Sequence, residues 1–147
     1  MIRKHLYGKY KLTYTNELFP HEEVNETRVK EIIDSMTQND LFTKPIIVDR
    51  MTKLIIDGHH RYNAAISIGL KRVPTFEVNY LQTRLKAFKE DTNNHLISKN
   101  HIIKTAQSRK LLKTKATCHV FYKSKKSCLS IEAATPQMKP ISLKNLI

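Results

Sequence analysis

The first eighty residues alternate between apolar runs and polar breaks in a pattern that predicts six short elements. Between Val29 and Met36, apolar residues recur at i, i+3, i+4 and i+7, which is the spacing of one face of an amphipathic helix. Asn25 or Thr27 is expected to cap this helix. The full predicted order is an edge strand over 9–18, this helix, strands over 45–49 and 54–56 joined by a turn, a helix over 59–68 and a strand over 73–78. This order predicts a small α/β unit with a mixed sheet and flanking helices.

The pattern is weaker after residue 80. We expect a short helix over 81–89, a polar linker over 91–94 and a helix over 99–109 that Ser98 caps. Short strands are expected over 117–122 and 127–131, and the segment 141–147 is expected to return and pack. The chain of 147 residues is thus predicted to form a core over 1–80 and a basic C-terminal extension over 81–147 that packs on this core.

The stretch LIIDGHHRYNAAISIGL joins a predicted buried strand to a predicted helix through Asp57 and Gly58. The first backbone N–H groups of a helix and the helix dipole favour an anion. His59, His60 and Arg61 fall in the first turn, where positive charge opposes the dipole unless an anion such as a phosphate binds there. The alternative is a solvated first turn that carries these basic residues by chance. We interpret the stretch as an anion site.

Asp57 stands at the carboxyl end of a predicted strand, where α/β folds commonly place ligands. A carboxylate beside a phosphate site can hold Mg²⁺, which is usually bound by one or two carboxylates together with phosphate oxygens. The alternative is an aspartate that merely favours the turn. The residue type alone does not separate these two interpretations.

The motif DGHHRYNAA, followed by GLKRVP, resembles the ParB/sulfiredoxin-like fold over about residues 11–80 and more weakly over 96–121. In that fold, an element of the form G-x-H-R at this turn contacts nucleotide phosphates. The form D-G-H-H-R most resembles the free L-serine kinases, which make O-phosphoserine from serine and a nucleotide. The resemblance implies Mg²⁺-dependent phosphoryl transfer from ATP or ADP to free L-serine. It implies that Gly58, His59, His60 and Arg61 bind the nucleotide, and that Asp57 holds the metal and takes part in catalysis.

The resemblance also implies a catalytic role for Glu22. In the kinases, a glutamate after a histidine in the loop before the first helix accepts the proton of the serine hydroxyl. Glu22, which follows His21, matches this position. Glu23 is the competing candidate, and an acidic surface loop without chemistry is the alternative.

A third stretch, KATCH, begins at Lys115 and resembles a K-T-T-R-H-like stretch that helps to hold the substrate in the kinases. Lys115, Thr117 and His119 match this stretch. Cys118 stands where the kinases have an arginine, and an arginine can clamp a carboxylate or a phosphate with two parallel hydrogen bonds. This departure bears on which substrate the chain accepts.

The net charge of the chain is +13. Residues 1–80 carry 12 basic and 10 acidic side chains, whereas residues 81–147 carry 14 basic and 3 acidic side chains. This imbalance suggests an anionic substrate or a polyanionic partner, and a solvated basic face without a partner is the alternative. The second function that we consider is therefore a ParB-like DNA-binding or nuclease protein without kinase activity, which binds nucleic acid without sequence preference through its C-terminal half.

The sequence also favours a cytoplasmic location. No apolar run is long enough to span a membrane, and the basic N-terminal segment lacks the apolar centre of a signal peptide. Cys118 and Cys128 match no metal-binding spacing, and we expect two ordinary thiols rather than a disulfide.

Overall fold

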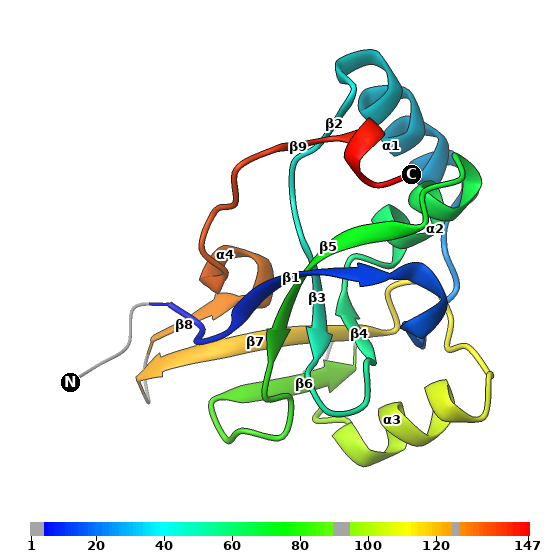
Figure 1. The fold of residues 1–147 in the computed structure, drawn as a ribbon. Helices are drawn as coiled ribbons and strands as arrows, with labels where there is room; N and C mark the ends of the chain where they lie inside the picture. The colour runs from blue at the N-terminus through cyan, green and yellow to red at the C-terminus, as the bar shows by residue number, and fades with distance from the viewer. Residues whose placement is uncertain (1–4, 90–94, 125–126) are drawn as a thin grey trace.

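The computed structural model describes residues 5–89, 95–124 and 127–147. A four-stranded sheet crosses its centre in the order β1-β5-β3-β4 (Figure 1). Its strands are β1 (Lys9–Tyr14), β3 (Ile46–Asp49), β4 (Ile55–Asp57) and β5 (Arg72–Val78). The pair β3–β5 is parallel, whereas the pairs β1–β5 and β3–β4 are antiparallel. The predicted mixed sheet is confirmed, and β1 lies at its edge as expected.

Two helices cover one face of this sheet. α1 (Glu26–Asn39) begins after Asn25, whose side chain accepts the Arg28 N–H at 3.1 Å, and ends at Asp40 in a left-handed conformation. α2 (His59–Ser67) follows β4 directly. Between the helices and the sheet lies the helix-side core, whose buried members are Leu18, Val29, Met36, Phe42, Ile46, Val48, Ile55, Ala64, Ala65, Leu70, Val73, Leu143 and Leu146. Both helices are confirmed, and of the two candidate caps Asn25 is the one used.

The other face of the sheet packs against a three-stranded antiparallel sheet in the order β6-β7-β8. Its strands are β6 (Leu85–Lys89), β7 (Thr117–Ser124) and β8 (Ser127–Ser130). Along β3, Ile46 and Val48 point into the helix-side core and Ile47 into the core between the sheets, as the two-residue period of a strand requires. This inter-sheet core also takes in buried residues of α3 (Lys99–Gln107) and α4 (Ile131–Ala134).

The C-terminal segment returns to the helix-side core. β9 (Ile141–Ser142) pairs with β2 (Leu41–Phe42), and the N–H groups of Lys71 and Arg72 donate to the Leu146 carbonyl at 2.9 and 3.1 Å. Leu143, in the 3-10 turn η2 (Leu143–Asn145), and Leu146 are both buried. The expected return of residues 141–147 is confirmed.

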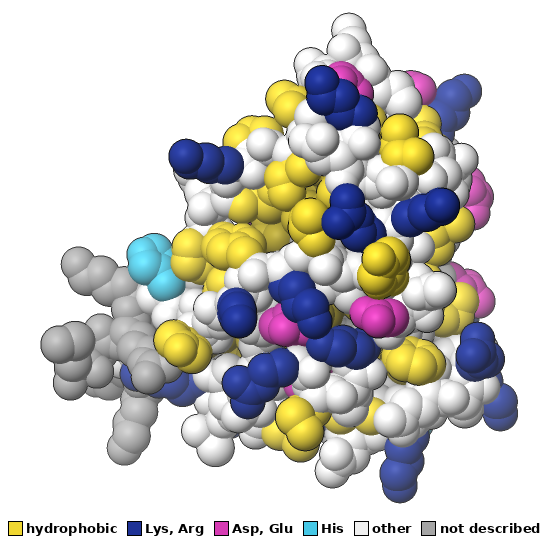
Figure 2. Space-filling view, viewed as in Figure 1, with side chains coloured by type: hydrophobic (Ala, Val, Ile, Leu, Met, Phe, Trp, Pro, Cys, Tyr) yellow, Lys and Arg dark blue, Asp and Glu magenta, His cyan; other side chains and the backbone are white. Residues whose placement is uncertain are grey.

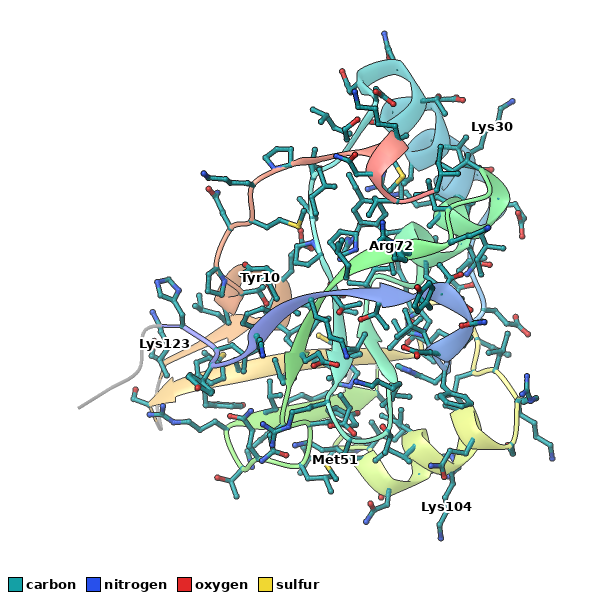
Figure 3. All side chains as sticks on the ribbon, in the orientation of Figure 1. Tyr10, Lys30, Met51, Arg72, Lys104 and Lys123 are labelled. Carbon is teal, nitrogen blue, oxygen red and sulfur yellow. The ribbon has the colours of Figure 1, made fainter. Side chains whose placement is uncertain are left out.

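Tyr10 connects the edge strand to the segment after α4. Its ring lies 4.8 Å from the ring of Phe76, and its hydroxyl donates to the Pro136 carbonyl. Figure 3 shows Tyr10 of β1 beside α4, which comes much later in the chain. The N-terminal strand, which ends in the 3-10 turn η1 (Thr15–Glu17), therefore helps to place the C-terminal part of the chain.

The segment 81–89 was predicted wrongly: it contains the strand β6 and not a helix. Leu85 and Ala87 are buried while Lys86 between them is exposed, and this alternation suits a strand that pairs with β7. β2 and α4, with two and four residues, are too short to leave a periodic pattern. The expected linker over 91–94 lies outside the described residues. Within the described residues, no helix has the length and apolar character to cross a membrane.

We expect Leu146→Ala to lower the free energy of unfolding by about 2–5 kcal/mol, because truncation leaves a cavity in the helix-side core. The neighbouring Ile147 is 71% exposed, so Ile147→Ala is the matched control and should change stability by about 0.5 kcal/mol or less. Urea denaturation of both variants measures the difference. Equal stability of the two variants would show that the C-terminal segment does not contribute to the core in solution.

Candidate functional site

A cavity of about 340 Å³ opens where β4 passes through a tight turn into α2. The loop before α1, the N-terminus of α2 and the beginning of β7 provide its walls. All nine residues that the sequence predicted for the site line this one cavity: Glu22, Asp57, Gly58, His59, His60, Arg61, Lys115, Thr117 and His119. The fold therefore brings three distant stretches of the chain together, and their individual roles stay predictions.

Gly58 shapes the turn at the beginning of α2. Its φ of +105° lies in the left-handed region that favours glycine. A Cβ at this position would come within 3.0 Å of the Arg61 guanidinium and 3.3 Å of the Ile46 Cα. Glycine offers no side chain to cap α2, so the first N–H groups of the helix can bind an anion in the cavity.

Arg61 folds back beneath this turn. Its Nη2 donates to the Pro45 carbonyl at 2.9 Å and lies 3.4 Å from the Asp57 carboxylate. Its Nε is buried, and within the described residues it has no hydrogen-bond partner. An unpaired buried donor costs free energy, which an acceptor atom of a ligand would recover. Arg61 thus places a fixed positive charge beside the N-terminus of α2.

The two histidines of the turn correct the expectation that the sequence HHR is positively charged throughout. His59 Nε2 accepts the His21 N–H at 3.0 Å, and His60 Nε2 accepts the Asn25 N–H at 3.1 Å. Neither nitrogen therefore carries a proton. Burial is the main cause that lowers the pKa of both imidazoles, and that of His59 falls well below its ordinary value. Both histidines are neutral near pH 7, so Arg61 is the only one of these three residues that carries a positive charge.

The loop that carries Glu22 is fixed from both sides. The Glu23 N–H donates to the Leu112 carbonyl, and the Leu112 N–H donates to the His21 carbonyl, both at 2.7 Å. The side chain of His21 is fully buried, and its Nδ1 lies 2.9 Å from the Ile55 carbonyl of β4. Burial lowers the pKa of His21 to about 4, so this ring is neutral as well. The loop is therefore held in place between β4 and the segment before β7.

Glu22 itself is bound by Thr117. One carboxylate oxygen, Oε1, accepts the Thr117 N–H at 2.9 Å and the Thr117 hydroxyl at 2.6 Å. Burial raises the pKa of Glu22, and the two hydrogen bonds from Thr117 partly oppose this shift. A partly buried carboxylate with a raised pKa is suited to accept a proton. The competing candidate, Glu23, is exposed and does not line the cavity.

His119 and Lys115 contribute to the cavity in different ways. His119 is buried, and its Nε2 lies 2.8 Å from the Tyr80 hydroxyl. Burial lowers the pKa of His119 to about 3, so the ring is neutral and shares one hydrogen bond with the Tyr80 hydroxyl. Lys115 is exposed at the rim. Of the predicted substrate residues, Lys115 alone therefore adds positive charge.

Asp57 is the candidate metal ligand. Burial raises the pKa of its carboxyl group, and the nearby Arg61 opposes this effect. No cluster of three or more His, Cys, Asp and Glu residues in the described parts of the chain could hold a metal ion by itself. Mg²⁺ is commonly bound by only one or two carboxylates, with phosphates supplying further oxygens. The donors present fit an Mg²⁺ ion that arrives with a nucleotide, and they do not fit a metal held by protein alone.

The sequence analysis missed several residues around the cavity. Arg28, Ser130 and Glu132 also line it, and a second hollow of about 630 Å³ adjoins it through Arg61, Ser130 and Glu132. Lys44 also lines this second hollow and donates to Glu132 at 2.6 Å. Glu132 belongs to the short helix α4, which no pattern in the sequence predicted. The sequence alone does not identify such residues, because they reach the cavity only when the two sheets are packed together.

Comparison with known proteins agrees with this geometry. Residues 10–93 match the model of the ParB N-terminal domain family, so the chain belongs to that family. A ParB-like protein of Sulfolobus acidocaldarius is 38% identical over 75 residues, which are 50% of this chain and 37% of that protein. The ADP-dependent L-serine kinase SerK of Thermococcus kodakarensis is 31% identical over 88 residues, which are 53% of this chain and 36% of that protein. The matched region thus spans about a third of the length of these relatives.

Solved structures extend the likeness of the fold to almost the whole chain. A free serine kinase in complex with AMP has a TM-score of 0.76, and the superposition covers 94% of this chain and 93% of that chain. The sequence identity is 13%, so this match concerns the fold alone. The predicted ParB/sulfiredoxin-like architecture is confirmed, and the match includes residues beyond the family model.

Proposed function

We propose that the protein is a nucleotide-dependent kinase that transfers a phosphoryl group to the hydroxyl of free L-serine and forms O-phosphoserine. The observation that carries the proposal is one cavity that contains both a partly buried carboxylate, Glu22, and an uncapped helix N-terminus with Arg61 beside it. Transfer of a phosphoryl group to a hydroxyl requires a base and a phosphate site that lie close to each other. The relatives named L-serine kinases support serine as the acceptor.

The phosphates of ATP or ADP are proposed to bind at the beginning of α2. The N–H groups of this turn and the Arg61 guanidinium supply hydrogen-bond donors and positive charge. Because His59 and His60 are neutral, they contribute hydrogen bonds and shape rather than charge. The adjoining hollow has apolar walls that include Pro45 and Met138, and its size suits a nucleoside.

Asp57 is proposed to hold Mg²⁺ together with the phosphate oxygens. When bound, the ion neutralises charge that develops on the transferred phosphoryl group. Burial raises the pKa of Asp57 because it disfavours the ionised carboxylate, and a bound cation would offset that cost.

The acceptor is proposed to lie on the side of the cavity formed by β7. Glu22 takes the hydroxyl proton, Lys115 and His119 hold the amino acid, and Thr117 lines the same side of the cavity beside Glu22. Lys115 would attract the serine carboxylate. Cys118 also lines the cavity and cannot supply the bidentate clamp of an arginine, so recognition of the carboxylate depends more heavily on Lys115.

Incubation with Mg²⁺, ATP or ADP and a panel of amino acids tests this function directly. We expect O-phosphoserine as the product, detected by mass spectrometry. If serine stays unmodified while nucleotide binding is measurable, the protein is a nucleotide-binding module and not a serine kinase.

Binding of nucleic acid is the second candidate function, and the charge of residues 81–147 favours it. Lys and Arg side chains are spread over the face of the molecule shown in Figure 2. Lys104 projects outward from α3, and Lys123 lies on β7 (Figure 3). Such a surface would bind phosphates without reading bases.

If this second function operates, affinity for DNA should fall steeply with salt, by a factor set by the number of phosphates contacted. A gel shift across a salt series measures this slope, and replacing Lys104 and Lys123 by Gln should weaken binding. Lys30→Gln, on exposed α1 surface, is the matched control. An unshifted probe at low salt would eliminate nucleic-acid binding.

Glu22→Gln keeps the size of the side chain and removes the base. We expect the turnover number for serine phosphorylation to fall roughly 10²–10⁴-fold, with nucleotide affinity nearly unchanged, because Glu22 acts mainly in the transition state. The exposed neighbour provides the control, and Glu23→Gln should retain wild-type turnover. Full activity of the Glu22 variant would show that another group is the base, and Glu23 and Asp57 would be the next candidates.

Arg61→Ala should weaken nucleotide binding by about 1.5–3 kcal/mol, the range for hydrogen bonds to charged groups. Titration calorimetry with ADP measures this change. Arg50 lies on the turn between β3 and β4, is exposed and does not line the cavity, so Arg50→Ala should bind like the wild type. A folded Arg61 variant with unchanged affinity would contradict the phosphate role.

A further inference from the structure

Thr117 gives both of its hydrogen-bond donors to a single oxygen atom of Glu22. The backbone N–H donates to Oε1 at 2.9 Å, and the side-chain hydroxyl donates to the same atom at 2.6 Å. Thr117 is the first residue of β7, and its partner in β6 is Lys89, so its backbone is anchored in the second sheet. The carboxylate of Glu22 is thus held by a rigid element rather than by its own loop.

The hydroxyl of Thr117 has a second neighbour, because His21 Nε2 lies 3.2 Å from Oγ1. His21 Nδ1 faces the Ile55 carbonyl, which can only accept, so Nδ1 carries the hydrogen of the neutral ring and Nε2 is an acceptor. One hydroxyl hydrogen therefore faces two acceptors. The ionised carboxylate is the stronger and closer of the two, and the hydrogen points to Glu22 while that group is charged.

His21 provides this hydroxyl with an alternative acceptor once Glu22 has taken up a proton. A protonated carboxyl group is a weaker acceptor, so the hydroxyl of Thr117 can then turn to His21 Nε2. The hydroxyl has a partner in both protonation states of Glu22, and neither state leaves a buried donor unpaired.

The second carboxylate oxygen, Oε2, is not bound by Thr117. His59 Nδ1 lies 3.9 Å from Oε2, which is beyond a normal hydrogen bond. Because Oε1 already accepts two donors, Oε2 is the atom on which a proton from a substrate would be accepted. Thr117 therefore determines which oxygen acts as the base and in which direction it faces.

We propose that Thr117 is a positioning residue for Glu22, which fixes Oε1 with its N–H and hydroxyl so that Oε2 removes the proton of the acceptor hydroxyl. This inference rests on the proposed function. The O–H bond of serine breaks as Oε2 takes the proton, the serine oxygen forms the new bond to phosphorus, and the bond to the nucleotide oxygen breaks with its electron pair left on the nucleotide. Thr117 acts through Glu22, whereas a threonine that held serine directly would use its hydroxyl on the substrate.

The two roles of Thr117 predict different kinetics. Thr117→Val keeps the shape of the side chain and removes the hydroxyl. If Thr117 positions Glu22, the pKa of Glu22 rises, because a hydrogen bond to the ionised form has been lost. The acidic limb of the profile of kcat/KM against pH should then move upward by about 1 pH unit. The KM for serine should change by less than about threefold, while kcat falls.

Thr117→Ser restores the hydroxyl and should recover most of kcat and the wild-type pH profile. A large rise in the KM for serine with an unchanged pH profile would overturn the proposal and assign Thr117 to substrate binding. Failure of the serine variant to recover activity would overturn it as well.

A measurement without substrate separates this inference from the proposed function. In the protein without ligand, a ¹³C NMR titration of the glutamate carboxyl groups, with Glu22→Gln to assign the Glu22 signal, reports the pKa of Glu22 directly. That pKa should be higher in Thr117→Val than in the wild type and should return in Thr117→Ser. An unchanged titration in a folded valine variant overturns the positioning role, whatever the activity assay finds. A shifted titration in a protein that does not phosphorylate serine would leave the contact established and refute the kinase.

Discussion

The buried side chain of His21 is the contact on which the site depends. Through its ring it joins β4 at the Ile55 carbonyl and β7 at the Thr117 hydroxyl, and through its backbone N–H it reaches His59 at the start of α2. Three elements that are distant in the sequence therefore meet on one residue that has no exposed surface. Because each of its polar atoms is matched, a change in any one element would leave a buried group unpaired. The position of the adjacent Glu22 follows from this network.

Burial determines the charge of the cavity. It lowers the pKa values of His59 and His60, which the sequence suggested as cations, and it raises those of the carboxyl groups of Glu22 and Asp57. Positive charge is left at Arg61 beside the helix N-terminus and at Arg28 and Lys115, which also line the cavity. The cavity thus offers a fixed cation and N–H donors on one side, and a carboxylate ready to accept a proton on another.

The cavity also shows why the C-terminal part of the chain is needed. Residues 1–80 contribute the turn before α2 and the loop of Glu22, yet Thr117 of β7 binds the carboxylate, and His119 of β7 shares a hydrogen bond with Tyr80, which lies in the turn after β5. Lys99 donates to the carbonyl groups of Tyr80 and Gln82, which fixes the chain where it leaves the first sheet. The second sheet is therefore both a cover for the inter-sheet core and a wall of the site.

The sequence by itself determined most of the first eighty residues, because each of those elements has a clear local signal. The spacing from Val29 to Met36 and the cap at Asn25 specify α1, and the Asp57-Gly58 turn specifies the step from β4 into α2. The motif around that turn also pointed to Asp57, Gly58, His59, His60 and Arg61, which line the cavity. Local patterns carry this information because helix faces, caps and glycine turns depend on residues close in the chain.

Only the tertiary structure decided the rest. The segment around Leu85 has a weak local preference, and its pairing with β7 makes it a strand. The charges of His59 and His60 depend on burial and on backbone donors from another loop, which sequence spacing cannot show. Glu132 reaches the cavity through a helix of four residues, and Thr117 meets Glu22 across 95 positions of the chain. Each of these features arises from long-range packing, because desolvation and hydrogen-bond partners exist only after the two sheets have come together.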